Sequence, residues 1–314
     1  MKYLTALLFI ISPFVVQADA GRIFVTNEQG DSVSVINGAD NTVIKTIPIG
    51  KRPRGIGISP DGGEVYVAVS GDNLIAVIDP ESLEVTRTFA SGDDPEAFAV
   101  HKNGNIYISN EEDAKASVFD PKTGALVAEI EVGIEPEGVA ISADGHRVVV
   151  TSESTNMLHI IDVPEHTIAR NILVGARPRA ATFSADGKTV YATSEISGEV
   201  KKVDVATGEI LGRMPLSDDK AKPKDVLLSN DGTRLFVAGG RANRIFVLDA
   251  EALTILKSVK VGKRVWGLAL NADGTRLYTT DGVDHQISVI DTSKLEVVAT
   301  VPVGKFPWGI VVKN

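Results

Sequence analysis

The sequence predicts an all-β protein, a seven-bladed β-propeller of four-stranded antiparallel blades, on three observations. A loop of the form VGxxPxG recurs seven times, and its successive copies lie 41 to 45 residues apart. Between these loops run short segments of alternating apolar residues rich in Val, Ile and Thr, which is the pattern of strands rather than helices. Four such strands repeated at about 42 residues are typical of propeller blades.

The repeated loop marks where each blade begins. It reads IGKRPRG at residue 49 and VGKFPWG at residue 303, and Val265 takes the place of proline in one copy. The copy around Pro223, KAKPKDV, is degenerate and coincides with an insertion around residues 218–222. We therefore expect seven blades, one of which carries an irregular first loop.

Each unit contains its elements in the same order. A first strand such as GIGIS leads into a turn that contains Asp-Gly, which supplies the positive φ angles that hairpin turns need. A second strand such as IFVTN follows, and a third strand ends in an acid or an amide. Because this residue recurs in every unit, we predict that it holds a turn by accepting hydrogen bonds from backbone N–H groups. The residues are Asn37, Asp79, Asp120, Asp162, Asp204, Asp249 and Asp291.

The two ends of the chain predict how the ring closes. The segment after residue 20 opens on a second strand at residues 23–26, and the chain stops just after a first strand at residues 309–312. We therefore expect the C-terminal strand to complete the first blade, which joins the ends by strand pairing and leaves no open edge there.

The first twenty residues have the pattern of a secretory signal peptide. Lys2 is followed by an apolar run over residues 4–16 and by Ala18-Asp19-Ala20. We expect cleavage after Ala20, export to the periplasm, and a single propeller domain over residues 21–314 that remains a monomer. The apolar run is too short to span a bilayer as a helix.

Composition narrows the classes of function. The chain has no Cys, so it has no disulfide, no thiolate metal site and no c-type haem attachment. Its net charge of −9 argues against nucleic acid as a global partner, because phosphate binding is driven by cationic surfaces. The five histidines fall in different units without ligand-like spacing, and we predict no metal site from them.

The second strands resemble the YVTN repeat family of bacterial seven-bladed propellers, and the resemblance covers residues 21–314. Segments such as GKRPRG, DPEAFAVHKNG, VGIEPEG, TSESTNM and GKFPWGIVVKN are similar to a narrower group, the pyrroloquinoline quinone (PQQ)-dependent catabolism-associated β-propeller proteins. The resemblance implies a periplasmic setting linked to PQQ-dependent alcohol oxidation. It implies as partner a protein of a PQQ-dependent dehydrogenase or transport system.

The VGxxPxG loops are expected to surround one mouth of the central channel. In a four-stranded blade the first strand lines the channel, so the fourth-to-first and second-to-third loops share one face. The residues that follow the proline position then form a ring, and we call them the ring residues. In blade order from the loop at residue 49 they are Arg54, Glu96, Glu137, Arg179, Lys224, Trp266 and Trp308.

The ring suggests a binding site for a planar anion. We hypothesise that Trp266 and Trp308 form a flat apolar wall beside guanidinium groups, since indole offers a stacking face and arginine pairs with carboxylates. PQQ, a planar tricarboxylate, is a possible ligand, and no cofactor is otherwise implied. The opposing interpretation is that the indoles plug the channel and the charges are solvated. The candidate ligand-binding residues are Arg52, Arg54, Arg177, Arg179, Arg264, Trp266, Trp308, Glu153 and Glu195.

Our leading prediction is a non-enzymatic binding or scaffold propeller that engages a small anion or a protein partner at the channel mouth. A lactonase-like hydrolase is the first alternative, with Glu153, Glu195 and Arg179 as its cluster. We expect the blades to hold the two glutamates too far apart for shared proton chemistry. A nucleic-acid-binding propeller is the second alternative, with Lys51, Arg52 and Arg54 beside the tryptophans.

Overall fold

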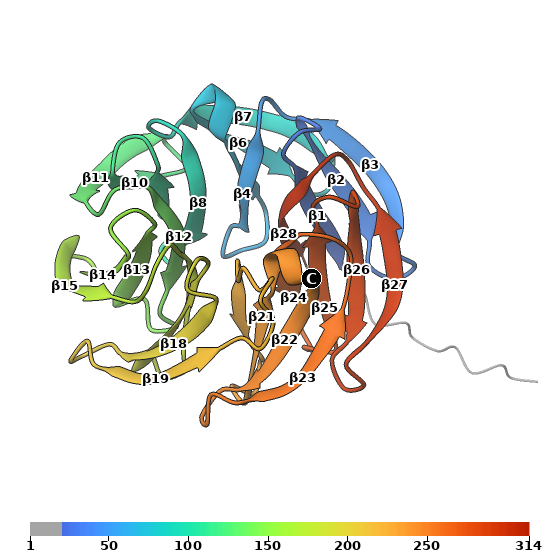
Figure 1. Cartoon of the computed structure of the whole chain (residues 1–314). Helices are drawn as coiled ribbons and strands as arrows, with labels where there is room; N and C mark the ends of the chain where they lie inside the picture. Colours follow the sequence, from blue (N-terminus) through green and yellow to red (C-terminus); the bar gives the residue numbers. More distant parts are fainter. Residues whose placement is uncertain (1–20, 314) are drawn as a thin grey trace, which may run out of the picture.

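The computed structural model describes residues 21–313 as seven four-stranded antiparallel sheets arranged around a central channel (Figure 1). This confirms the predicted fold class and the number of blades. The signal peptide predicted for residues 1–20 lies outside the described residues. Blade one consists of β28 (Pro307–Lys313), β1 (Arg22–Asn27), β2 (Ser32–Asn37) and β3 (Thr42–Pro48), from the channel outward.

The other blades follow in chain order, each with its first strand at the channel. Blade two comprises β4 (Pro53–Ile58), β5 (Val65–Val69), β6 (Leu74–Asp79) and β7 (Glu84–Ala90). Blade three comprises β8 (Pro95–Val100), β9 (Ile106–Asn110), β10 (Lys115–Asp120) and β11 (Ala125–Glu131). Blade four comprises β12 (Pro136–Ile141), β13 (Arg147–Ser152), β14 (Met157–Asp162) and β15 (Thr167–Leu173). Blade five comprises β16 (Pro178–Phe183), β17 (Thr189–Ser194), β18 (Glu199–Asp204) and β19 (Ile210–Pro215). Blade six comprises β20 (Val226–Leu228), β21 (Arg234–Ala238), β22 (Arg244–Asp249) and β23 (Ile255–Lys260). Blade seven comprises β24 (Val265–Leu270), β25 (Arg276–Asp281), β26 (Gln286–Asp291) and β27 (Glu296–Pro302).

The ring closes by strand pairing, as predicted. The C-terminal strand β28 runs antiparallel to β1, with Arg22 opposite Lys313 and Val25 opposite Ile310. Two short 3-10 turns, η1 (Ser70–Asp72) and η2 (Gly240–Ala242), are the helical elements that the structure assigns within residues 21–313. No described helix has the length and apolar character that crossing a membrane would require.

Apolar side chains of adjacent blades interlock between the sheets. At the closure, Ile23 and Ile36 of blade one pack with Tyr278 and Val289 of blade seven, and all four are buried. Because second strands are covered on both faces by neighbouring blades, they read as near-continuous apolar segments. Burial of this kind stabilises a fold by roughly 25 cal/mol per Å² of apolar surface.

A β-bulge in the first strand sets the direction of each ring residue. In blade four, Pro136 lies opposite Ser152 and Val139 opposite Val150, so the first strand contains one extra residue around Glu137. A bulge bends its strand and re-aims the side chain beside it. A register shift at the same position occurs in six of the seven blades, with β20 of blade six as the exception.

A hydroxyl group on the second strand stabilises this bulge and connects it to the next blade. In blade four, Thr151 Oγ1 accepts a hydrogen bond from Gly138 N (2.8 Å) and donates one to the carbonyl of Arg179 in blade five (3.1 Å). The same pair of bonds is made in five blades by Thr26, Ser109, Thr151, Thr193 and Thr280. We call this hydroxyl the interblade hydroxyl.

The close approach of neighbouring blades explains the small residue that follows a ring residue. A Cβ atom on Gly138 would lie 2.4 Å from the carbonyl oxygen of Arg179, and one on Gly309 would lie 2.5 Å from that of Arg54. Contacts this short are not tolerated against backbone, so glycine is required at both positions.

The strand-end acids hold turns in six of the seven units. Asp79 Oδ1, for example, accepts hydrogen bonds from the N–H groups of Glu81 (2.8 Å) and Ser82 (2.9 Å). Equivalent bonds are made by Asn37, Asp120, Asp204, Asp249 and Asp291. The prediction was wrong for Asp162, which instead forms an ion pair with Arg147 at 3.1 Å. Two residues after Asp162 stands Pro164, which has no N–H to donate.

We predict that Thr151→Val destabilises the protein by about 1–3 kcal/mol, because Gly138 N and the Arg179 carbonyl lose their shared partner in a buried position. Valine conserves the shape and the β propensity, so the loss reports the hydroxyl alone. Thr167→Val, at an exposed strand position, is the matched control. The midpoints of urea unfolding compare the two variants, and equal midpoints would contradict a role for the hydroxyl.

Candidate functional site

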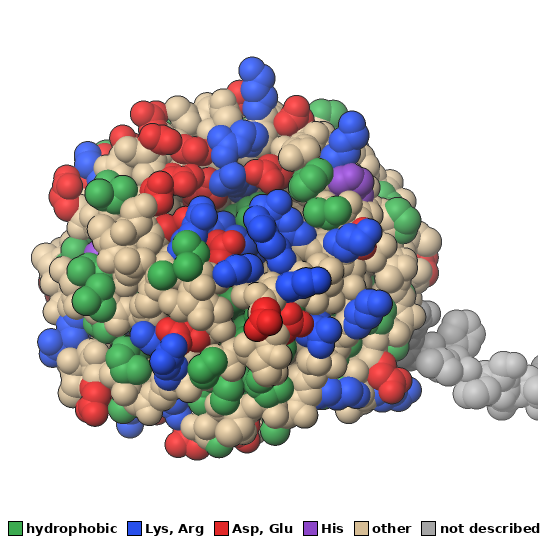
Figure 2. Space-filling view, in the orientation of Figure 1, with side chains coloured by type: hydrophobic (Ala, Val, Ile, Leu, Met, Phe, Trp, Pro, Cys, Tyr) green, Lys and Arg blue, Asp and Glu red, His purple; other side chains and the backbone are tan. Residues whose placement is uncertain are grey.

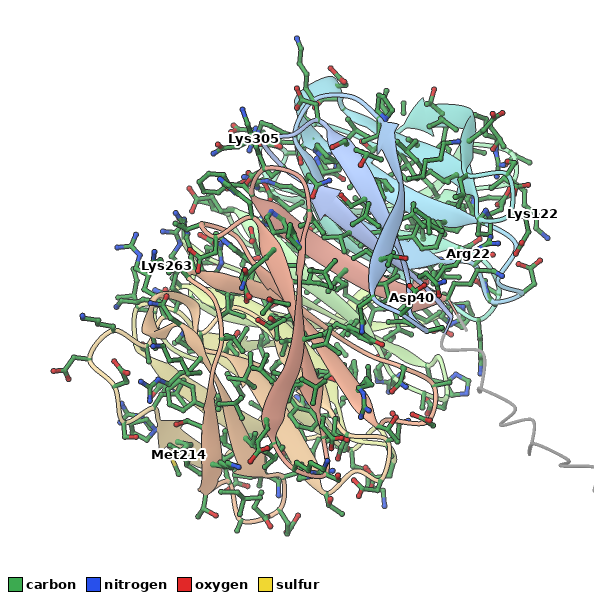
Figure 3. All side chains as sticks on the ribbon, turned by 90° about the vertical axis from the view of Figure 1, so that its right-hand side faces the viewer. Arg22, Asp40, Lys122, Met214, Lys263 and Lys305 are labelled. Carbon is green, nitrogen blue, oxygen red and sulfur yellow. The ribbon has the colours of Figure 1, made fainter. Side chains whose placement is uncertain are left out.

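The ring residues gather at one mouth of the channel, above a cavity of about 230 Å³. Five of them line this cavity, namely Glu137, Arg179, Lys224, Trp266 and Trp308. Figure 3 shows Lys263 and Lys305, from two of the VGxxPxG loops, at one end of the disc, and Asp40 and Lys122 at the other. The predicted placement of these loops on one face is therefore confirmed.

Two repeated backbone features bring the second-to-third loops beside the ring. The residue before the proline position has positive φ in six blades, as at Glu135 (56°) and Arg177 (59°). Its carbonyl accepts a hydrogen bond from the second-to-third loop, from Glu153 N to Glu135 (2.9 Å) and from Glu195 N to Arg177 (2.8 Å). Glu153 and Glu195 are placed in this way next to the ring residues of their own blades.

A compensated cluster of charges lies on the side of blades four to six. Three carboxylates, of Glu137, Glu153 and Glu195, meet three cations, of Arg177, Arg179 and Lys224. Arg179 contacts all three carboxylates: Nη2 lies 3.1 Å from Glu137, Nε lies 3.5 Å from Glu195, and Nη1 pairs with Glu153. Apart from Arg177, the members of this cluster are buried. Their charges balance within the cluster.

The structure brings Glu153 and Glu195 to the same two arginines. Both contact the guanidinium groups of Arg177 and Arg179, because the two loops converge on the residues before and after Pro178. Although burial acts to raise the pKa of Glu195, Lys224 and then Arg179 lower it below its usual value. Glu195 is thus held in its charged form, and both glutamates pair with these cations.

Lys224 and Asp225 form the irregular part of the ring in blade six. Burial, and next the charge of Arg179, lower the pKa of Lys224 to about 7, while its Nζ lies 2.7 Å from Glu195. Asp225 lies in the cavity wall and accepts hydrogen bonds from Leu268 N (2.9 Å) and Val226 N (2.8 Å). Burial raises the pKa of Asp225 to about 6.

Asp225 takes over the connection that the interblade hydroxyl makes elsewhere. Blade six has Ala238 at the position of Thr151 and Thr193, and the carboxylate of Asp225 bonds to blade seven instead. Our reasoning from the sequence missed this residue. The available signal was the loop KAKPKDV, the one copy with an acid where the others have Gly or Ala after the ring residue.

The two tryptophans stack on each other rather than forming one flat wall. Their ring centroids are 6.2 Å apart with planes inclined by 27°, and both side chains are half-buried. Three cations lie over Trp266, at 4.2 Å for Lys224 Nζ, 5.0 Å for the Arg264 guanidinium carbon and 5.4 Å for that of Arg179. Trp266 is thus the centre of a cationic and aromatic patch.

Arg264 has no carboxylate partner among residues 21–313, and its Nε is buried without a hydrogen bond. Arg177 holds the equivalent loop position in blade five and lies between Glu153 and Glu195. At the two corresponding positions beside Arg264 the chain has Gly240 and Gly282. The charge of Arg264 is therefore uncompensated because blades six and seven lack the glutamates.

The other candidate arginines are paired. Arg52 lies 3.6 Å from Asp94, and Arg54 lies 2.9 Å from Glu28 and also pairs with Glu96. Of the predicted site residues, the structure thus assembles Arg179, Arg264, Trp266 and Trp308 into one patch with Lys224. It places Arg52 and Arg54 in an acidic cluster that begins beside Trp308 in the closed ring.

Known proteins share the propeller fold of this chain. The model of the YNCE-like beta-propeller family matches residues 4–104. No curated protein matches the chain. Among solved structures, the chain is similar to a functionally unknown protein from Desulfotomaculum acetoxidans DSM 771, with a TM-score of 0.81, 15% identity and coverage of 94% of this chain and 99% of that one.

Two further solved structures are enzyme-related. Kuenenia stuttgartiensis hydrazine synthase has a TM-score of 0.76 and 22% identity, over 83% of this chain and 89% of that one. The dihydro-heme d1 dehydrogenase NirN, in complex with DHE, has a TM-score of 0.68 and 18% identity, over 94% of this chain and 66% of that one. At these identities the likeness concerns the fold, and the family match supports a β-propeller of this general kind.

Proposed function

We propose that this chain is a non-enzymatic binding propeller whose channel mouth takes a small planar anion between Arg264 and the stacked tryptophans. The observation that carries the proposal is the uncompensated guanidinium of Arg264, which lies over Trp266, a residue of the cavity wall. A cation without a counter-ion beside an aromatic face is a site for an anionic ring system. Gly240 and Gly282 stand where Glu153 and Glu195 pair with Arg177, so they offer Arg264 no carboxylate. A carboxylate of the ligand would take this place.

The surroundings of Arg264 supply the other contacts that such a ligand needs. Lys224 lines the cavity beneath the indoles and adds a second cation. Lys and Arg side chains gather around the centre of the face seen in Figure 2, and Lys51, Lys263 and Lys305 are exposed in the loops around the mouth. Such a field attracts anions to the mouth despite the net charge of −9.

The setting of this function is part of the proposal. The resemblance to PQQ-dependent catabolism-associated propellers and the signal-peptide pattern support a periplasmic protein that serves PQQ-dependent alcohol oxidation. PQQ, a planar tricarboxylate, belongs to the ligand class that the patch favours. The partner would be a protein of the dehydrogenase or transport system, which reaches the same exposed face.

The geometry favours neither alternative function. A hydrolase would need Glu153 and Glu195 free to exchange protons, whereas cations hold both as carboxylates. A nucleic-acid site would need free cations at Arg52 and Arg54, whereas both are paired with carboxylates. Neither cluster offers what the corresponding chemistry requires.

We predict that PQQ quenches the tryptophan fluorescence of the protein and that Arg264→Gln weakens this binding at least tenfold. The two tryptophans of the whole chain are Trp266 and Trp308, so the signal reports the site itself. A charge-assisted hydrogen bond contributes about 1.5–3 kcal/mol, which corresponds to a tenfold or larger change in Kd. Arg241→Gln, at an exposed position on the same face, should change Kd less than twofold. No quenching, or equal Kd values for both variants, would end the proposal.

We also predict that anion binding weakens as pH rises from 6 to 8. The pKa of Lys224 is about 7, so its positive charge is present below this pH and lost above it, while ligand carboxylates stay ionised throughout. Loss of one nearby charge at a partly screened site costs about 1 kcal/mol, or roughly fivefold in Kd. Titrations at pH 6, 7 and 8 should show this slope in the wild type and in Lys222→Met, but not in Lys224→Met. A flat wild-type profile would exclude Lys224 as a ligand contact.

A further inference from the structure

We infer that the channel mouth also holds a divalent cation, of the calcium class, between Asp94, Glu96 and Glu111. One carboxylate oxygen from each of these residues lies within 4.8 Å of those of the other two. Calcium binds oxygen ligands at about 2.3–2.6 Å, so two oxygens on one ion are at most about 5 Å apart. The three oxygens already satisfy this limit. The inference goes beyond the proposed anion site and does not depend on it.

Glu96 provides the strongest argument for a bound cation. Its side chain is completely buried, and its Oε2 accepts no hydrogen bond from residues 21–313. Its other oxygen, Oε1, pairs with Arg54. A buried carboxylate oxygen without a partner is costly, because it loses its hydration without compensation. Oδ1 of Asp94 is likewise buried and accepts no hydrogen bond.

The balance of charge supports a divalent ion. Arg52 and Arg54 are the cations that contact this cluster, and their carboxylate partners are Glu28, Asp94, Glu96 and Glu111. Two positive charges thus face four negative ones. The cluster of blades four to six, by contrast, is neutral, with three of each sign. A single divalent cation would complete the balance of the acidic cluster.

The donor set selects the kind of metal. All three groups are carboxylates, which hard cations prefer and which zinc sites seldom use alone. Asp94 and Glu111 are half-buried at the open mouth, so water can complete the coordination of an ion there. Two of the three ligands, Asp94 and Glu111, lie in loops at the mouth, and such a partly open site suits the variable coordination of calcium better than the strict octahedron of magnesium.

Arg54 remains compatible with an ion at this position. Its Nε and Nη2 atoms lie 3.0 Å and 2.9 Å from Glu28. Glu28 belongs to blade one, whereas Asp94 and Glu111 belong to blade three, on the other side of Arg54 in blade order. The Nη1 group lies 3.9 Å from Glu111, beyond hydrogen-bond distance. Oxygens of Glu111 and Asp94, and Oε2 of Glu96, are therefore available to a second cation.

The test is calorimetric titration of the chelator-treated mature protein with calcium chloride, and separately with magnesium chloride. We expect one calcium site with a Kd of about 10⁻⁵ to 10⁻³ M, within the range of extracellular calcium modules and sensors, and weaker magnesium binding. Glu111→Gln and Asp94→Asn should each weaken calcium binding at least tenfold. Glu112→Gln, the same change at the exposed neighbouring residue, should alter it less than twofold.

The outcomes separate this inference from the proposed function. Absence of calcium binding in the wild type, or unchanged binding in both Glu111→Gln and Asp94→Asn, would overturn the site. Magnesium binding tighter than calcium would overturn the choice of metal. Circular dichroism of each variant establishes that it is folded, and PQQ titration in chelator measures the anion site alone. Either site can therefore fail while the other stands.

Discussion

A single hydroxyl group in each of five blades determines how most of the channel mouth is assembled. Thr151, for example, holds the bulge of its own blade through Gly138 N and the backbone of the next ring residue through the Arg179 carbonyl. Five of the ring residues are in this way fixed relative to the blade before them. The distances within the charged clusters depend on these buried hydrogen bonds, since the ring residues lie beside the bulges of the first strands.

The two blades without this hydroxyl adjoin the two candidate sites. Blade two has Ala68 at the hydroxyl position, and the ring residue that it would hold is Glu96. Blade six has Ala238, and the corresponding ring residue is Trp266. Ser70 Oγ bonds to the Pro95 carbonyl in the first case (2.6 Å), and Asp225 bonds to Leu268 N in the second. At these two positions the chain departs from its own repeat. Such departures are expected at functional sites, because a residue needed for function can replace the one that the repeat would have there.

The sequence could predict the fold and the membership of the ring, but not how the charges pair. The period of the loops and the strand at each end sufficed for seven blades closed by β28, because the repeat fixes both. Pairing depends on the bulge and on positive φ at residues such as Glu135 and Arg177, which steer side chains across blade boundaries. The sequence therefore could not show that Glu153 and Glu195 pair with the same two arginines. The stacking of Trp266 on Trp308 depends on Gly282, where a Cβ would lie 3.0 Å from the Trp266 ring.

The mouth is divided into arcs of opposite charge, and this division explains how a protein of net charge −9 can hold an anion. Figure 2 shows acidic side chains gathered on one part of the face and basic ones near its centre. In the closed ring the neutral cluster around Arg179 lies between Glu96 and Trp266 in one direction, and Trp308 and Arg54 lie between them in the other. A cluster whose charges balance contributes little to the electrostatic potential. The potential near the acidic arc therefore stays negative and that near the basic arc stays positive. Two ligands of opposite charge can then occupy one face of the propeller without competing for the same residues.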